Sequence, residues 1–143
     1  METHQGTLSS LDLEMIKAID HHLEELYESK VPQMVAQKMV DANLQTSQVR
    51  GLENLVMSTR RFSEIINYIK NQSGKDRKGQ WTHFVDELLH QLEDLEIKAK
   101  GIGKSNPSVV LEIKRRLARG WVKQIVAHYF FSHSLKKEED NAG

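Results

Sequence analysis

Apolar residues recur at three- and four-residue steps along almost the whole chain, and this spacing constrains the fold more than any other feature. It is clearest between Val49 and Ile69, where eight apolar side chains fall on one face of a helix. No segment shows convincing two-residue alternation of apolar and polar residues, which is the pattern of a half-buried strand. We therefore predict an all-α fold, a compact bundle of five helices.

The predicted helices begin at recognisable start signals. Ser9 or Ser10 can cap the first helix, and Pro32 suits the first turn of the second. Thr46 or Ser47 can cap the third, with Leu44 packing back as a staple, and Asn106 before Pro107 can cap the fifth. The predicted ranges are 10–29, 31–42, 47–71, 81–99 and from 107 onward.

The length of 143 residues allows one domain with a real core. We expect residues 1–143 to form that single domain, with disordered tails at 1–9 and 136–143. The connections 71–80 and 100–105 are rich in Gly, Lys and Arg, so we expect them to be exposed. No run of about 20 apolar residues and no secretory leader is present, and Cys is absent. These features predict a cytoplasmic protein with no membrane partner.

Charge is zero overall but alternates in blocks along the chain. Residues 1–44 hold 3 Lys or Arg against 8 Asp or Glu, and residues 45–80 hold 7 against 3. Residues 81–100 hold 2 against 5, and residues 101–143 hold 8 against 4. Adjacent basic segments would form one positive face, and an acidic face could meet the basic face of a neighbouring copy. Ordinary solvated helix faces would give the same pattern.

The fifth predicted helix carries the strongest candidate site. Lys114 and Arg115 precede a basic stripe, defined here as Arg116, Arg119 and Lys123, whose members follow each other at steps of three and four residues. The opposite face is apolar, so the basic stripe is expected to face solvent. Arginines about 5 Å apart can follow successive phosphates and hold each with two hydrogen bonds. A solubilising face that pairs with acidic helices is the alternative.

Two other patterns point to chemistry less strongly. His83, Glu87 and His90 could lie on one side of a helix, and Glu87 with His90 has the spacing of carboxylate-bridged di-iron bundles. Such a site needs a second Glu-x-x-His, which the chain lacks. The segment 101–105, GIGKS, lacks the first Gly of a phosphate-binding loop because residue 98 is Lys98. We predict no catalytic residue, no bound metal and no cofactor.

Residues 44–55 resemble the opening of a long helix in the Csm small-subunit family of type III CRISPR effector complexes. The shared motif is Thr-Ser-x-hydrophobic-Arg, which runs here from Thr46 to Arg50. The stretch from Arg116 to Phe130 is similar to the last helix of that family, where basic residues lead into an aromatic end. The resemblance covers roughly residues 40–132. The small subunit of the related Cmr complexes is a close second.

The resemblance implies a non-catalytic subunit for antiviral defence. It would bind the backbones of guide RNA and target RNA, contact other effector subunits, and self-associate into short stacks. Sequence-independent phosphate contacts suit such a subunit because base pairing supplies the specificity. The candidate RNA-binding residues are Arg50, Arg60, Arg61, Lys75, Arg77, Lys78, Lys114, Arg115, Arg116, Arg119 and Lys123. A helical adaptor that binds only proteins, or a metal-dependent helical enzyme using the His83 group, would be the alternatives from other classes.

Overall fold

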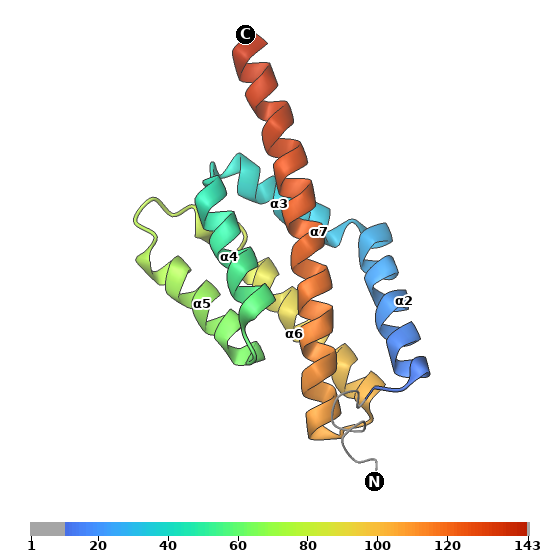
Figure 1. The fold of residues 1–143 in the computed structure, drawn as a ribbon. Coiled ribbons are helices and arrows are strands. Elements are labelled where there is room, and N and C mark those ends of the chain that lie inside the picture. Colours follow the sequence, from blue (N-terminus) through green and yellow to red (C-terminus); the bar gives the residue numbers. More distant parts are fainter. Residues whose placement is uncertain (1–10, 143) are drawn as a thin grey trace.

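The computed structural model describes residues 11–142, which form α-helices and one short 3-10 helix without any strand (Figure 1). The predicted all-α class is therefore confirmed for this part of the chain. The elements are α2 (Leu13–Ser29), α3 (Val31–Asp41), α4 (Thr46–Ser58), α5 (Phe62–Lys75), η1 (Trp81–His83), α6 (Val85–Gly103) and α7 (Pro107–Ala142).

Helix α7 is the central element of the bundle. It has 36 residues, a length of about 54 Å at 1.5 Å per residue. It contacts α2, α3, α4, α5 and α6. Figure 1 shows α4 and α2 on opposite sides of α7 and the last turns of α7 extending beyond the bundle. Its predicted core face is fully buried: Ile113, Leu117, Trp121, Ile125 and Tyr129.

Two hydrogen bonds satisfy the polar atoms that this core face carries inward. Trp121 Nε1 donates to Gln91 Oε1 of α6 over 2.7 Å. The Tyr129 hydroxyl donates to the backbone carbonyl of Leu44 over 2.6 Å. Because an unpaired buried donor costs about 1 to 3 kcal/mol, these bonds select the orientation in which α6 and the start of α4 dock on α7.

The predicted single helix over 47–71 is wrong, because the chain breaks into α4 and α5. Thr59 and Arg61 are extended, and Arg61 N–H donates to Thr59 Oγ1 over 3.2 Å. The Thr59 hydroxyl also donates to the Glu64 carboxylate. A threonine side chain that bonds nearby backbone groups competes with helical hydrogen bonds, and here it stabilises a corner. Helix α5 can then fold against α4, to which it is joined by this corner.

The predicted start of the fifth helix is confirmed, whereas the predicted caps of the first and third helices are wrong. Asn106 Oδ1 accepts from Val109 N–H over 3.4 Å, and α7 begins at Pro107 as predicted. Helix α2 is capped by Asp12, whose carboxylate accepts from Met15 N–H over 2.8 Å, and not by Ser9 or Ser10, which lie outside the described residues.

Helix α4 is capped one residue earlier than predicted, at Gln45. The Gln45 N–H donates to Gln48 Oε1 over 3.0 Å, which supplies the reciprocal half of a capping box. Thr46 and Ser47 are already in the first turn of the helix. Leu44 is buried, as expected for a residue that packs back against the helix.

Two connections are shorter than the sequence suggested. Helix α5 continues to Lys75, so the first connection spans 76–80 and ends in η1 instead of an α-helix at Trp81. Helix α6 continues through Gly103, which is buried where α6 turns into α7. A Cβ at Gly103 would lie 2.7 Å from Val110 Cγ2 and 3.3 Å from Val110 Cα, so only glycine allows this close packing.

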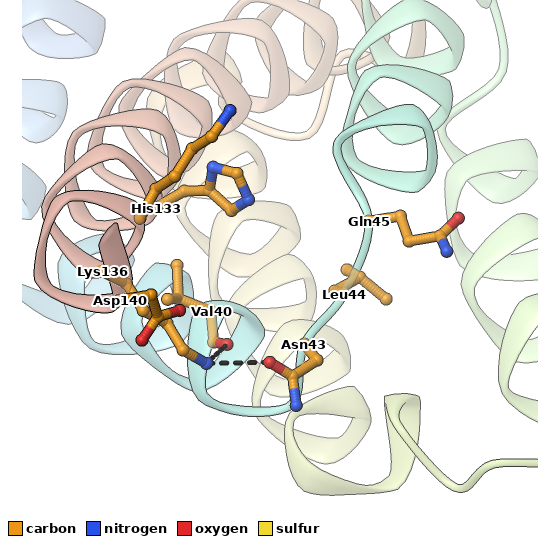
Figure 2. A pocket seen from close by; sticks show the side chains of 8 residues that line it. Val40, Asn43, Leu44, Gln45, His133, Lys136 and Asp140 are labelled. Carbon is orange, nitrogen blue, oxygen red and sulfur yellow. Dashed lines mark hydrogen bonds between the residues drawn. The ribbon is translucent and has the colours of Figure 1, made fainter. Parts of the chain in front are cut away.

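The C-terminal segment is also more ordered than predicted. Residues 136–142 continue α7, although a disordered tail was expected at 136–143. Lys136 Nζ donates to the Asn43 side-chain carbonyl over 2.8 Å and to the Val40 backbone carbonyl over 3.3 Å, as Figure 2 shows. These bonds join the segment to the turn between α3 and α4. The predicted tail at 1–9 and residue 143 lie outside the described residues.

None of the helices in residues 11–142 is both long enough and apolar enough to cross a bilayer.

The packing at Gly103 generates a stability prediction. Gly103→Ala should destabilise the fold by about 1 to 3 kcal/mol, because the added methyl group overpacks against α7. Gly101→Ala is the matched control, since nothing lies within 4 Å of the position of its Cβ. This second substitution should stabilise the helix by about 0.5 to 1 kcal/mol. Urea unfolding of both variants measures the difference, and equal stabilities would contradict the packing.

Candidate nucleic-acid interface

The basic stripe lies on the face of α7 that points away from the core. Arg116 and Lys123 are exposed and Arg119 is half-buried, whereas Leu117 and Trp121 between them are buried. Steps of three and four residues correspond to about 5 Å along the helix axis. The structure therefore presents cationic side chains in a row that an extended polyanion can follow.

Glu112 occupies the N-terminal end of this row. Its carboxylate accepts from Arg115 Nη1 over 3.1 Å and from Arg116 Nε over 3.0 Å. Arg115 and Arg116 are thus already paired within α7. Partly exposed pairs of this kind contribute only about 0 to 1 kcal/mol, so a phosphate can replace the carboxylate at small cost.

Arg119 lacks such a carboxylate partner in the described part of the chain. Its Nε is buried there without a hydrogen-bond partner, and the same is true of Arg115 Nε. A buried guanidinium N–H that is left unpaired is unfavourable. These two atoms are the clearest unfilled donors on the basic side of α7.

The docking of α4 places Arg50 against α7. Its guanidinium carbon lies 4.3 Å from the ring centroid of Phe130, and its Nη1 pairs with Glu53 Oε1 over 2.6 Å. A cation over an aromatic face is held in place by the ring quadrupole. Arg50 was expected at an RNA surface, but the contact with Phe130 was not foreseen, because nothing local in the sequence links residues 80 positions apart.

The buried side chain of Tyr129 holds α4 and α7 together. Its hydroxyl bond to the Leu44 carbonyl ties α7 to the start of α4, and its ring stacks on His133 with centroids 5.4 Å apart. Burial raises the pKa of Tyr129, so the hydroxyl stays protonated and remains a donor.

A second cationic group lies at the corner between α4 and α5. Arg60, Arg61 and Lys114 line one open cavity of about 320 Å³. Lys114 Nζ pairs with Glu96 Oε2 over 2.8 Å and lies 5.5 Å from the Phe62 ring centroid. Lys114 directly precedes Arg115, but successive helix residues point about 100° apart, so this corner lies on a different side of α7 from the basic stripe.

The remaining predicted residues are elsewhere. Lys75, Arg77 and Lys78 line a different cavity at the far end of α5. A helix of 14 residues separates them from Arg61, which corresponds to about 20 Å. The eleven candidate residues therefore do not form a single patch: Lys75, Arg77 and Lys78 form a cluster separate from the residues on α4, on α7 and at the corner between α4 and α5.

His83, Glu87 and His90 do not come together as a metal site in the structure. His83 lies in η1, whereas Glu87 and His90 lie in α6, so the three residues do not share one helix as the sequence suggested. Glu87 pairs with Lys38, and His90 contacts Asp94 over 3.6 Å. Within residues 11–142 no group of three or more His, Cys, Asp or Glu side chains could hold a metal ion.

Helix α2 lies on the other side of α7 from α4 (Figure 1). Its five acidic residues are all exposed: Glu14, Asp20, Glu24, Glu25 and Glu28. The first acidic block of the sequence is therefore largely a surface of α2, and the second acidic block lies mainly on α6.

Comparison with known protein families places most of the chain in one family. A model of the DUF5100 family, described as a domain of unknown function, matches residues 5–129. The chain belongs to the DUF5100 family. No curated protein and no solved structure matches it. The part that matches the DUF5100 model contains all eleven candidate RNA-binding residues.

The docking of α4 generates a second stability prediction for this DUF5100 protein. Tyr129→Phe should destabilise the fold by about 1 to 2 kcal/mol, because the Leu44 carbonyl loses its buried donor. Tyr27→Phe removes the same hydroxyl from an exposed residue and should change stability by less than about 0.5 kcal/mol. Thermal or urea unfolding would show the contrast; a Tyr129→Phe variant as stable as the Tyr27 control would rule out this anchoring role.

Proposed function

We propose that this protein is a non-catalytic RNA-binding subunit that contacts the phosphate backbone through the surface formed by α4 and α7. The observation that carries the proposal is the basic stripe, in which Arg116 and Lys123 are exposed and Arg119 is half-buried. Near one end of it, on another side of α7, Arg60, Arg61 and Lys114 line a separate cavity. Arg50 is held near the other end by Phe130. Helix α7 rises about 24 Å between Lys114 and Phe130, enough for several successive phosphates.

A net charge of zero is compatible with this role because most acidic residues lie on elements other than α7. The five exposed carboxylates of α2 lie on the opposite side of α7 from α4. Screening at physiological salt limits their effect to about 8 Å. An RNA on the basic side would therefore experience mainly the positive groups.

The biological setting that we propose is a type III CRISPR effector complex in the cytoplasm. The support is the resemblance of Thr46 to Arg50 and of the basic-to-aromatic stretch of α7 to the Csm small subunits. In that setting the RNA partners are guide RNA and target RNA, and the protein partners are the other effector subunits. Copies would stack with the acidic α2 of one against the basic surface of the next.

An adaptor that binds only proteins is the second candidate. It is favoured by Phe131 and Leu135, which lie one turn apart on the projecting end of α7 and are 64% and 46% exposed. Large exposed apolar side chains at this spacing suit a helical partner. The two candidates differ in a simple observable, since the adaptor has no affinity for RNA.

RNA binding should be electrostatic and indifferent to sequence. Fluorescence anisotropy with two unrelated single-stranded RNAs should give similar affinities, which fall steeply as salt is raised. Lys123→Ala should reduce the slope of log affinity against log salt by about 0.7 to 1. Lys17→Ala, which removes the same charge from exposed α2, should leave the slope unchanged. A flat salt response, or equal effects of both variants, would favour the adaptor.

Removing Glu112 should have the opposite effect. Glu112→Gln releases Arg115 and Arg116 from their shared carboxylate, so RNA affinity should rise, by up to about fivefold for 1 kcal/mol. Glu28→Gln removes the same charge from the exposed surface of α2 and should have little effect. If Glu112→Gln weakens binding, the carboxylate orients the arginines instead of competing with RNA.

A further inference from the structure

Lys75, Arg77 and Lys78, at the far end of α5, line an open cavity of about 300 Å³. Its walls come from the start of α4, the last turns of α5, the connection 76–80 and η1. The lining residues are Gln45, Gln48, Gln72, Lys75, Asp76, Arg77, Lys78, Gln80 and Trp81. The volume is at the lower end of the range for small-molecule sites.

The walls are held in place by hydrogen bonds between segments distant in sequence. Gln80 Nε2 donates to the backbone carbonyls of Ala42 (3.1 Å) and Asn43 (2.8 Å), which ties the connection to the turn before α4. Asp76 Oδ2 accepts from Trp81 N–H over 2.5 Å. The connection is therefore anchored by these bonds, and Arg77 and Lys78 within it are exposed, as its composition predicted.

The charges around this cavity favour an anion. Lys75, Arg77 and Lys78 contribute three positive charges, and none of them forms an ion pair within residues 11–142. Asp76 is the one acidic residue in the lining, and one of its oxygens is already engaged by the Trp81 backbone. The first turn of α4 adds the positive end of a helix dipole beside Gln45 and Gln48.

The neutral lining favours a ligand that also carries a heterocycle. Four glutamine amides line the cavity; Gln80 Nε2 and Gln48 Oε1 already have partners within the protein, whereas no such bond engages the Gln72 amide in residues 11–142. An amide presents a donor and an acceptor side by side, the arrangement that pairs with base edges. Figure 2 shows the Gln45 side chain turned away from Lys136 and Asp140 of α7. Arginine, as at Arg77, also stacks its planar guanidinium on bases.

Trp81 is a lining residue with an unpaired buried donor. The residue is 1% exposed and lines the cavity, yet its indole Nε1 has no hydrogen-bond partner in the described structure. The other tryptophan, Trp121, is equally buried, but its Nε1 donates to Gln91. Buried donors are normally paired, so an acceptor in the cavity would complete Trp81.

From these contacts we infer that the cavity binds a nucleoside phosphate, with Lys75, Arg77 and Lys78 on the phosphate and the glutamine amides on the base. The nucleotide is either free or a single unit of an RNA strand. The site is about 20 Å from the Arg61 corner and does not depend on the basic stripe.

The two indole N–H signals provide the test. The full-length ¹⁵N-labelled protein is titrated with each of the four nucleoside 5′-monophosphates, with the corresponding nucleosides and with inorganic phosphate. The Trp81 indole N–H resonance should shift with nucleotides, while the Trp121 resonance stays in place as an internal control. Nucleosides and inorganic phosphate should bind at least tenfold more weakly, since each lacks half of the recognised groups. Equal responses to nucleotide and inorganic phosphate would overturn the base-binding part.

Charge variants assign the response to the cavity. Lys75→Ala should weaken nucleotide binding several-fold and Arg77→Glu should abolish it. Lys70→Ala, on the same helix but outside the lining, is the matched control and should leave binding unchanged. An unmoved Trp81 signal with every nucleotide and with a single-stranded RNA, in a protein that retains its folded spectrum, would overturn the inference.

The source of the nucleotide is decided by the same signal. A Trp81 shift with free nucleotide identifies a small-molecule site, whereas a shift with RNA alone identifies a nucleotide within a strand. Repeating the titration with Lys123→Ala separates the two proposals. A variant that loses RNA affinity but keeps the Trp81 response to nucleotide leaves this site intact, and loss of the Trp81 response alone leaves the RNA surface intact.

Discussion

Burial of one face of α7 is the constraint on which the rest of the structure depends. The side chains from Ile113 to Tyr129 that point inward are fully buried, and α2, α3, α4 and α6 all pack around them. Each buried large apolar side chain contributes about 1.5 to 3 kcal/mol, so this face supplies a major share of the core. Since the inward face is fixed, the outward face is fixed too, so Arg116 and Lys123 are exposed and Arg119 is half-buried at the edge of that face.

The corner at Thr59 determines how the other cations are distributed. If residues 47–71 formed one helix, Arg50, Arg61 and Lys75 would be spread along a single rod. The hydroxyl bonds of Thr59 end α4, and α5 folds back beside it. This places Arg60 and Arg61 next to Lys114 of α7, and it carries Lys75 to a separate cavity near the start of α4. A single hydroxyl group thus separates one long cationic helix into two distinct sites.

The sequence predicted the parts of this arrangement that rest on local rules. The apolar period identified the core face of α7, and Asn106 with Pro107 identified its start. It did not predict the break at Thr59, because the apolar spacing continues through it and the competing bonds are made by a single side chain. Nor did it predict the contact of Arg50 with Phe130 or the bonds of Lys136 to Val40 and Asn43, which depend on tertiary docking. The separation of His83 from Glu87 and His90 follows from the one-turn η1, which periodicity cannot distinguish from the first turn of α6.

Helix α4 connects the two proposed sites mechanically. Gln45 and Gln48, at the start of this helix, line the nucleotide cavity. Arg50, two residues after Gln48, lies over the Phe130 ring of α7. The buried hydrogen bond from Tyr129 to the Leu44 carbonyl ties the start of α4 to α7. Because one helix carries residues of both proposed sites, the docking of α4 on α7 fixes the position of the cavity relative to Arg50.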